Sequence, residues 1–579
     1  MKPDSTDISK ERLQRLVDNG IQMGMERDRT KLLRHILLSG RQIANCDAAT
    51  LYLMSESRSL RFALRSRDDD LPSFEIPLYD AQTGAPNEKH VSTYVALNNV
   101  PVNIDDVYAE KRFDLSGTRH YDAESGYRTV SMLTLPMAPR GGEVLGVLQF
   151  INALDPVSGE IVPFDDGLVD LMRALAAQAA VALDNQQLVE TQSALLNGMI
   201  RSISGAIDAK SPYTGGHCER VPELAMMLAE AACTEDKGTL ADFRFSSDEE
   251  WQEFRIGIWL HDCGKVVTPV HVVDKATKLE TLYNRIHEIR TRFEVLLRDA
   301  EIERLNTRLA GGDAAAADAR FAARKQQLFD DFAFLAECNI GGESMSANQS
   351  ARIREIAGQT WLRHFDDRLG LAHEELARAN QTPRAELPAS EHLLTDRPEH
   401  IVQRPHGERS AHEAHGFRLQ PTEHQQNCGE IYNLSIPYGT LNSEERYIVN
   451  EHIVQTIEML DRLPFPKHLR RVPEYAGTHH ETLTGSGYPR GLTAAELSIP
   501  ARIVAIADVF EALTASDRPY KRAKKLSESV RILHGFKQRG HIDPELFDLF
   551  LTSGVYLHYA ERFLAPEQVD AVDIHTYLG

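Results

Sequence analysis

His261 and Asp262 are neighbours that directly follow the apolar run Ile256–Leu260. That run is expected to be buried, and an unpaired buried charge is costly. A metal ion is a natural partner, because an imidazole binds one ion and a carboxylate can bridge two. An ordinary hydrogen-bonded pair is the alternative, and it is favoured unless further ligands accompany the two residues.

Further candidate ligands lie in the same half of the chain. His479 and His480 precede the Gly-rich stretch 481–492, so both imidazoles could face one site beside an open loop. Asp508 lies within the otherwise apolar helix expected over 501–510. A carboxylate is hard to explain there by solvation, whereas binding of a cation explains it.

Two more histidines lie on expected helices. His452 is placed on a helix predicted over 444–460, and His217 is placed at a helix start. A lone histidine in such a place is usually structural. Together with the residues above, however, the two histidines form one set within half of the chain. The set predicts a shared metal centre.

The whole pattern resembles the HD-GYP family, a branch of the HD-domain phosphohydrolases. Members of that family fold as helical bundles, bind two or three metal ions, often iron or manganese, and hydrolyse cyclic di-GMP. The resemblance covers most of 207–535, apart from an insertion. The matching stretches are Pro212–Val221, His261–Lys265, Leu441–Glu445 with His452, His479–Glu481 with Gly487–Pro489, Ala507–Leu513 and Asp517–Lys521.

The resemblance implies a role for each matched residue. Asp262 and Lys265 are the implied catalytic residues. The implied metal ligands are His217, His261, Asp262, His452, His479, His480 and Asp508. The implied substrate-binding residues are Lys265, Gly487, Tyr488, Pro489, Arg518 and Lys521. The departures from the family pattern, at Cys263, Thr484 and Glu511, remove none of these ligands.

The implied cofactor is a pair of divalent ions, Fe or Mn first, with Mg, Ni, Co or Zn as the other candidates. Family members with a third ion hold it with a Glu four residues before the histidine that matches His217. Here that position is Tyr213, whose phenol seldom replaces a carboxylate as a hard-cation ligand. The expected reaction is attack of hydroxide on a phosphodiester of cyclic di-GMP, which yields linear pGpG and, after a second cut, GMP.

Two alternatives to this function stay open. One is an HD phosphohydrolase that acts on another nucleotide, such as a hybrid cyclic dinucleotide. The other is a non-catalytic receptor or adaptor for cyclic di-GMP. The retained ligands argue against the second alternative, because a chain without catalysis would be free to lose His479 or Asp508.

The N-terminal half has an α+β pattern. A helix is predicted over 10–40, and an Ala-rich closing helix begins near 165. Strand-like runs lie between them at 48–54, 60–64, 131–136 and 144–151. This order, with the phrases Gly146–Asn152, Pro163–Asp166 and Ala177–Leu183, resembles a GAF domain, a sensor fold.

The cyclic-nucleotide type of GAF site is not expected here. Asn152 is followed by Ala153 rather than by Lys, and Phe164 lacks the correctly spaced acidic pair. The expected GAF ligand is therefore an unknown small molecule, or none.

The closing helix is expected to continue into a linker. Val181, Leu188 and Leu195 are seven residues apart, as in a coiled-coil seam, although polar residues lie between them. A parallel homodimer is the favoured interpretation, and a single buried helix is the alternative. The predicted divisions are an N-terminal helix or tail (1–28), a GAF-like sensor (29–186), a helical linker (187–206) and an all-α HD-GYP bundle (207–579).

The C-terminal bundle is predicted to contain a large insertion at about 292–432, with an Ala-rich helix and a polar loop. The loop contains histidines without an apolar face to frame them, which favours solvated side chains over a second metal site. These histidines are His400, His406, His412, His415 and His424.

Composition excludes several classes of function. The chain has 579 residues, with 64 Lys and Arg against 85 Asp and Glu, a net charge of −21. So acidic a chain is a poor candidate for binding nucleic-acid polymers. No apolar run is long enough for a membrane span or a secretory signal. The six cysteines form no CxxC pair, which favours reduced thiols and a cytoplasmic protein.

Overall fold

The structure, a computed structural model, describes residues 5–66, 75–139, 142–210, 216–341, 344–405, 416–515 and 523–579. It divides into two compact units, residues 1–196 and 197–579. Each unit has its own hydrophobic core, so the two are described separately.

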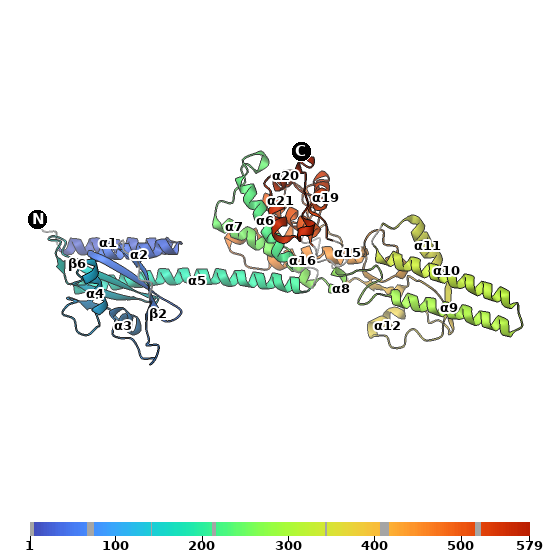
Figure 1. Cartoon of the computed structure of the whole chain (residues 1–579), viewed down its shortest axis with the longest axis horizontal. Helices are drawn as coiled ribbons and strands as arrows, with labels where there is room; N and C mark the ends of the chain where they lie inside the picture. Colours follow the sequence, from blue (N-terminus) through green and yellow to red (C-terminus); the bar gives the residue numbers. More distant parts are fainter. Residues whose placement is uncertain are drawn as a thin grey trace. The chain divides into compact units, whose positions relative to one another are not determined.

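The N-terminal unit is built on one seven-stranded antiparallel sheet (Figure 1). The strand order is β3-β2-β1-β6-β5-β4, and β7 pairs with β6. The strands are β1 (Cys46–Met54), β2 (Ser59–Arg65), β3 (Glu75–Pro77), β4 (Val102–Ile104), β5 (Met132–Met137), β6 (Gly146–Leu154) and β7 (Ile161–Val162). The strands predicted from the sequence are β1, β2, β5 and β6.

Helices cover both faces of this sheet. Side chains alternate between the faces along β1, so Leu51 packs on one side and Tyr52 on the other. The Leu51 side is covered by α2 (Arg29–Ala44) and the first part of α5 (Asp166–Lys210). The other side is covered by α3 (Val91–Asn98), and α4 spans Ser116–Ser125. The predicted α+β unit is confirmed.

The single helix predicted over 10–40 is wrong. The segment forms two helices, α1 (Ser5–Met25) and α2, which are separated at residues 26–28. Asp28 has extended backbone angles, and its carboxylate accepts a hydrogen bond from the backbone N–H of Lys31 at 3.0 Å. An aspartate at this position is a preferred N-cap, so it starts a new helix rather than continuing the first.

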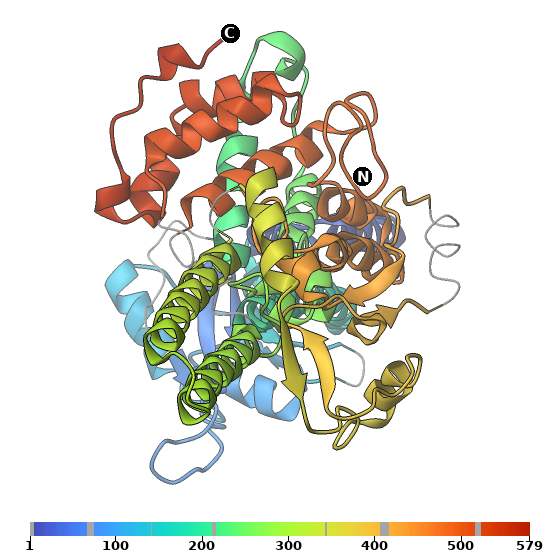
Figure 2. The same cartoon turned by 90° about the vertical axis from the view of Figure 1, so that its right-hand side faces the viewer.

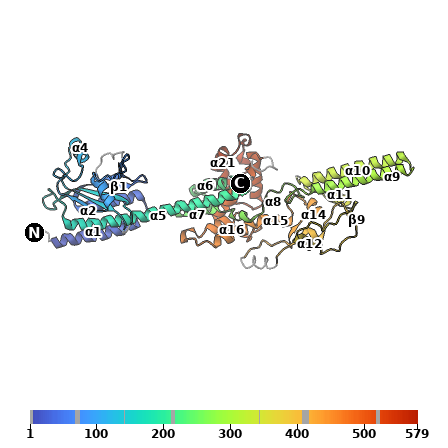
Figure 3. The same cartoon turned by 90° about the horizontal axis from the view of Figure 1, so that it is seen from below.

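The helix α5 continues without a break for 45 residues, as Figures 1 and 3 show. Its seam residues Val181, Leu188 and Leu195 are 46 %, 59 % and 59 % exposed. The alternative of a single buried helix is therefore wrong, and the homodimer stays a prediction. Among the residues that the structure describes, no helix has both the length and the apolar character to cross a membrane.

The C-terminal unit is mostly helical, as predicted. Its main core joins α6, α7 and α17–α21 and contains large buried side chains such as Phe254, Phe510 and Phe550. The helices around this core are α6 (His217–Thr234), α7 (Asp248–Trp259), α8 (Val270–Val273), α15 (Ser443–Asn450), α16 (His452–Asp461), α17 (Val472–Gly477), α18 (Ile499–Thr514), α19 (Leu526–Gln538), α20 (Pro544–Thr552) and α21 (Val555–Phe563). Short 3-10 turns include η2 (Cys263–Val267).

The helix predicted over 444–460 is divided. α15 ends at Asn450, and α16 begins at His452, with Glu451 between them. The division places His452 in the first turn of a new helix rather than in the middle of a long one.

The predicted insertion contains an antiparallel helical hairpin and two small sheets. In Figures 1 and 2, α9 (Ile286–Leu309) and α10 (Ala314–Ile340) lie side by side. A separate hydrophobic cluster extends from Leu279 to Leu434. The remaining elements are α11 (Ala347–Ala357), β8 (Thr360–Arg363), α12 (His373–Ala379), β9 (Ala389–His392), β10 (Ile401–Gln403), β11 (His424–Asn427) and α14 (Glu430–Leu434).

The predicted solvated histidine loop is only partly a loop. His424 begins β11, which pairs with β10, and His400 precedes β10 directly. Both side chains are partly buried. Strand pairing in this polar segment could not be foreseen from its composition. His406, His412 and His415 lie outside the described residues.

We predict that the exposed seam of α5 forms a parallel homodimer. The double substitution Leu188→Glu with Leu195→Glu places like charges in the seam and should convert the dimer to a monomer in light scattering. The matched control is Val189→Glu with Leu196→Glu, which adds the same charges one position further along the helix. A wild-type monomer, or equal effects of the two pairs, would contradict the prediction.

Candidate metal centre

The seven predicted ligands come together in the C-terminal unit. Each lies where an element begins or ends, except Asp508, which lies inside the buried helix α18. His217 and His452 are the first residues of α6 and α16. His261 and Asp262 follow α7, and His479 and His480 follow α17.

Asp262 lies between two groups of histidines. Its Oδ2 is 3.1 Å from Nε2 of His217 and 3.3 Å from Nε2 of His261. Its Oδ1 is 3.3 Å from Nε2 of His452. One carboxylate oxygen thus faces each group, which is the arrangement that a bridging ligand needs.

The other ligands complete the two groups. Asp508 Oδ1 lies 3.4 Å from Nε2 of His217 and 4.0 Å from Nε2 of His261. On the other side, Nε2 of His480 lies 3.3 Å from Nε2 of His452. His452, His479 and His480 form one set whose ligand atoms all lie within 4.8 Å of one another, and His217, His261 and Asp508 form another.

The backbone fixes which ring nitrogen three of the histidines present to the centre. Nδ1 of His261 contacts the carbonyl of Ile258 at 2.7 Å. Nδ1 of His479 contacts that of Ala476 at 2.9 Å, and Nδ1 of His452 contacts that of Val449. A carbonyl only accepts, so each Nδ1 carries the proton and each Nε2 keeps a lone pair. Such contacts hold metal-binding histidines in the correct tautomer.

His217 is held by a carboxylate instead. Its Nδ1 contacts Oε2 of the buried Glu511, and the other Glu511 oxygen accepts hydrogen bonds from Arg220 at 2.7 Å. A carboxylate behind a ligand histidine raises its basicity and fixes its orientation. Glu511 was noted in the sequence only as a departure from a family pattern, and its role depends on a contact across 294 residues.

Burial keeps His479 and His480 uncharged. Burial and the neighbouring His261 lower the pKa of His479 to about 3. Burial and the neighbouring His479 and His452 lower the pKa of His480 well below its usual value. Both rings are therefore neutral at neutral pH, which is the form that binds metal.

The carboxylates are ionised in spite of their burial. Burial opposes the charge of Asp262, but Lys265 and His261 hold its pKa well below the usual value. Burial likewise opposes the charge of Asp508, but its contact with His217 holds its pKa well below the usual value. The centre therefore offers two anionic carboxylates and, in His479 and His480, two neutral imidazoles, which suits borderline divalent cations.

Buried polar atoms without a hydrogen-bond partner indicate whether a metal ion would fit this site. Nε2 of His217, His261 and His479 and Oδ1 of Asp262 are fully buried and have no hydrogen-bond partner. Buried polar atoms are normally satisfied, and each exception is costly. Because these four atoms belong to residues that converge on one place, the donor set fits divalent metal ions.

Gly264 allows the two halves of the centre to meet. A Cβ at this position would lie 1.9 Å from the carbonyl oxygen of His452 and 2.6 Å from the backbone nitrogen of Thr456. The Gly264 N–H donates to Oγ1 of Thr456 at 2.9 Å, and that hydroxyl also lies 3.3 Å from the carbonyl of His261. Direct backbone contact between η2 and α16 therefore brings His452 to Asp262.

The loop at 481–492 is folded by the buried Glu481. Its carboxylate accepts hydrogen bonds from the backbone N–H groups of Arg490, Gly491 and Leu492 at 2.7, 3.1 and 2.9 Å. Tyr488 in this loop stacks on His480, with ring centroids 4.8 Å apart and an interplanar angle of 20°. The loop thus places an aromatic ring directly beside the metal centre.

Gly487 and Pro489 flank that tyrosine. A Cβ at Gly487 would lie 2.5 Å from the Cα of Glu481, so no larger residue fits there. Lys265 donates to Oδ2 of Asp262 at 2.5 Å and is 26 % exposed, so its ammonium can also reach a ligand. The remaining predicted residues, Arg518 and Lys521, lie outside the described residues, as does Tyr213.

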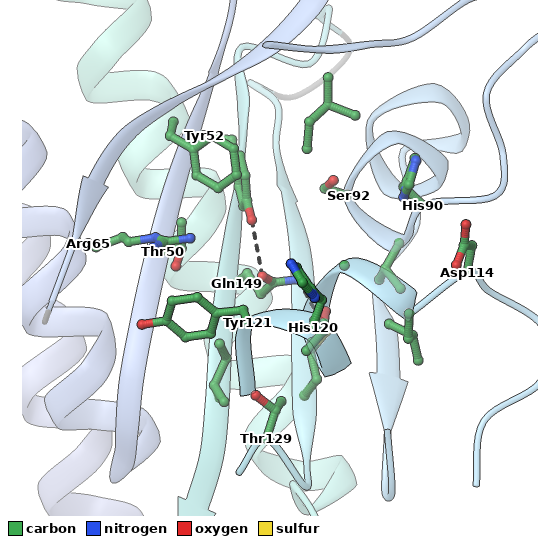
Figure 4. A pocket seen from close by; sticks show the side chains of 18 of the residues that line it. Thr50, Tyr52, Arg65, His90, Ser92, Asp114, His120, Tyr121, Thr129 and Gln149 are labelled. Atoms are coloured by element: carbon green, nitrogen blue, oxygen red, sulfur yellow. Dashed lines mark hydrogen bonds between the residues drawn. The ribbon is translucent and has the colours of Figure 1, made fainter. Parts of the chain in front are cut away.

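A second candidate site is a cavity of about 660 Å³ in the N-terminal unit. Figure 4 shows side chains from the sheet and from α3 that face it. On the sheet, Tyr52 donates to Oε1 of Gln149 at 3.2 Å. At the side, the Arg65 guanidinium lies over the rings of Phe62 and Tyr121, 5.2 and 5.3 Å from their centroids. The cavity is large enough for a small organic molecule.

Family models identify both domains. The GAF domain model matches residues 28–183, and the HD domain model matches residues 385–546. The chain therefore contains a GAF domain and an HD domain, as the sequence patterns indicated. The HD match includes His452, His479, His480 and Asp508 but begins after His217, His261 and Asp262.

Curated relatives match within limited stretches. The chain is 41 % identical over 115 residues to the 3′3′-cGAMP-specific phosphodiesterase 1 of Vibrio cholerae, which covers 20 % of this chain and 26 % of the relative. It is 41 % identical over 113 residues to a cyclic di-GMP phosphodiesterase of Thermotoga maritima, which covers 20 % of this chain and 30 % of the relative. A cyclic di-GMP phosphodiesterase of Pseudomonas aeruginosa is 42 % identical over 79 residues, covering 14 % and 18 %. The chain thus spans less than a third of the length of these relatives.

Solved structures also match the N-terminal unit. One is the GAF domain of an Acinetobacter phosphoenolpyruvate-protein phosphotransferase, at 15 % identity and a TM-score of 0.24, covering 31 % of this chain and 98 % of that one. Another is a methyl-accepting chemotaxis protein fragment, at 22 % identity and a TM-score of 0.24, covering 30 % and 98 %.

We predict that Gly264→Ala disrupts the metal centre. The added methyl would overlap the His452 carbonyl, so α16 must shift away from Asp262. Bound Mn²⁺, measured by elemental analysis after dialysis, should fall by at least about tenfold, as for loss of a group that orients a ligand. The control is Gly205→Ala, where the new methyl meets open space. Equal metal content in the two variants would refute the prediction.

Proposed function

We propose that this GAF- and HD-domain protein is a metal-dependent phosphodiesterase that hydrolyses cyclic dinucleotides, with cyclic di-GMP as the leading substrate. The observation that carries the proposal is the placement of Asp262 between two groups of histidine Nε2 atoms, several of them buried without a partner. The curated relatives named above, all called phosphodiesterases of cyclic dinucleotides, support the same chemistry.

The proposed cofactor is two divalent ions, with iron or manganese favoured. His217, His261 and Asp508 would hold one ion, and His452, His479 and His480 would hold the other. Asp262 would contribute one oxygen to each. Such a pair supplies a hydroxide at neutral pH by lowering the pKa of water, and it neutralises charge on a phosphate.

The residues around the ions position the substrate. Lys265 has its ammonium on Asp262 and is partly exposed, so it orients that carboxylate and can pair with a phosphate oxygen. Tyr488, held against His480, offers a flat face to a guanine base at the edge of the centre. Arg518 and Lys521 are proposed to add phosphate or guanine contacts.

The second candidate substrate is the hybrid cyclic GMP–AMP. Relatives named as cGAMP-specific and relatives named as specific for cyclic di-GMP match this chain at similar identity, 41 % in both cases. The metal centre would act on the phosphodiester, which both substrates contain. Selectivity between the two substrates would instead depend on contacts with their bases, which differ. We propose cyclic di-GMP as the substrate because the HD-GYP resemblance of the sequence implies it, with linear pGpG, and GMP after a second cut, as the product.

We further propose that the GAF domain regulates this activity by binding a small molecule. Its cavity combines aromatic walls, the guanidinium of Arg65 and the polar Tyr52–Gln149 pair. This lining suits a planar, mostly apolar molecule with one acceptor group directed at the arginine.

The main test is an assay of the manganese-loaded full chain against a panel that contains cyclic di-GMP, cyclic GMP–AMP and cyclic di-AMP. We expect cyclic di-GMP to be cleaved with the highest kcat/KM. Faster cleavage of cyclic GMP–AMP would establish the second candidate. Tight binding of cyclic di-GMP without any cleavage would instead identify a receptor and contradict the proposed activity.

We predict that Asp262→Ala abolishes hydrolysis and leaves the fold intact. Without the carboxylate between them, two cations would repel each other across the site. We expect kcat to fall by at least about a hundredfold, more than the loss of a residue that merely orients a ligand. Circular dichroism checks the fold, and Asp236→Ala, an exposed aspartate, is the control. Turnover like that of the wild type would disprove the mechanism.

We predict that deleting residues 1–186 changes the activity or the oligomeric state. The deletion removes the GAF cavity and the seam residue Val181, and it keeps residues 187–579 with the seam residues Leu188 and Leu195. If the GAF domain is coupled to the metal centre, kcat/KM should change by about fivefold or more. A truncated protein with the activity and mass distribution of the full chain would show that the GAF domain does not regulate it.

A further inference from the structure

The last turns of α5 contact the segments that carry the metal ligands. Within the C-terminal unit, residues 197–210 form the end of this helix. Three of its side chains make hydrogen bonds to backbone atoms that lie within a few residues of a ligand. None of the three belongs to the ligand set, and the proposed reaction does not use them.

Lys210 binds the segment that follows the ligand Asp262. Its ammonium donates to the carbonyl of Lys265 at 2.9 Å and to that of Val266 at 2.5 Å. Both carbonyls belong to η2, the turn that begins directly after Asp262. Two charge-assisted hydrogen bonds from one side chain fix this turn against the end of α5.

Ser204 binds the same region from its other end. Its hydroxyl is buried and donates to the carbonyl of Trp259 at 2.7 Å. Trp259 is the last residue of α7, two residues before His261. The pair His261–Asp262 is therefore held on both sides by one helix, at Trp259 before it and at Lys265 after it.

Asp208 binds the start of the helix that begins with His217. Its Oδ2 accepts a hydrogen bond from the backbone N–H of Gly216 at 3.1 Å, and its Oδ1 lies 3.4 Å from the backbone nitrogen of Cys218. The first N–H groups of a helix have no partner within it, so an acidic side chain there satisfies them. Asp208 thus fixes the backbone on each side of a third ligand.

The turn η2 also makes hydrogen bonds to a second helix, α16. Thr456 of α16 accepts from the N–H of Gly264 and lies beside the carbonyl of His261. The turn is consequently hydrogen-bonded both to α16, which carries His452, and to α5. Any shift of α5 would move His261, Asp262 and His217 relative to His452.

We infer that Lys210, Ser204 and Asp208 are positioning residues, which make the end of α5 a structural part of the metal centre. The inference rests on the proposed metal centre, and it identifies a route for the proposed regulation. The same helix begins at Asp166 and packs Leu168 and Met172 into the core of the GAF domain. A GAF-dependent shift or rotation of α5 would therefore reach the ligands through these three side chains.

The test is the rate at which the full chain, loaded with Mn²⁺, releases the ion to a chelator. We expect Lys210→Gln to speed release by about tenfold, the lower end of the effect of residues that orient ligands. Lys210→Arg keeps two donors and should restore a rate near that of the wild type. Hydrogen exchange of the amides of 260–268 should also accelerate in Lys210→Gln, with or without metal.

A serine pair supplies a matched control. Ser204→Ala removes the bond to Trp259 and should speed release, whereas Ser202→Ala removes an exposed hydroxyl that bonds to the carbonyl of Gly198 in its own helix. The serine pair keeps the test decisive if Lys210→Gln does not fold. Release rates within twofold of the wild type for Lys210→Gln, or for Ser204→Ala in that case, would overturn the inference.

These readouts separate the inference from the proposed function. Metal release and hydrogen exchange do not need a substrate, so the positioning role could stand even if no cyclic dinucleotide is cleaved. Conversely, an active enzyme whose variants release metal normally would refute the positioning role and leave the phosphodiesterase assignment intact.

Discussion

The buried carboxylate of Asp262 is the constraint on which the C-terminal unit depends. It is 2 % exposed and contacts imidazole groups on both sides, from α6, from the end of α7 and from α16. Burying such a charge is costly unless cations compensate it. Lys265 supplies one positive charge, and two bound metal ions would supply the remainder. The surrounding fold is arranged to bring compensating groups to this one side chain.

The elements around Asp262 meet through backbone atoms more than through large side chains. Gly264 brings η2 against α16, and Gly487 brings the loop after His480 against Glu481. His261, His452 and His479 are oriented by the carbonyls of residues three positions earlier in the chain, whereas His217 depends on Glu511. Orientation of the ligands is therefore largely a property of the main chain, and it is sensitive to small shifts of the helices that carry it.

The grouping of the seven candidate ligands was predictable from the family resemblance together with the chemistry of the residues. A histidine or aspartate inside an apolar segment has few explanations, and the structure brings all seven predicted ligands together. The contacts that hold them were not predictable. Glu511 meets His217 across 294 residues, and Lys210 reaches Lys265 across 55. Nothing in the local sequence marks such pairs, since they depend on tertiary packing.

Local signals explain the secondary-structure errors. At Asp28 the sequence contains a capping residue, which an analysis of apolar periodicity alone does not detect. The division between α15 and α16, in contrast, lies within a continuous helical pattern of apolar residues. The pairing of β10 with β11 joins polar segments 21 or more residues apart, where neither alternation nor apolar content indicates strands. Long-range pairing was therefore harder to predict than the grouping of the candidate ligands.

The central claim is that Asp262 joins two metal ions in one centre. The most direct measurement is a crystal structure of the manganese-loaded full chain with anomalous diffraction data, together with elemental analysis of the same sample. The account predicts two equivalents of metal per chain and two anomalous peaks, one on each side of Asp262. A third peak, a single ion, or metal bound away from these histidines would contradict it.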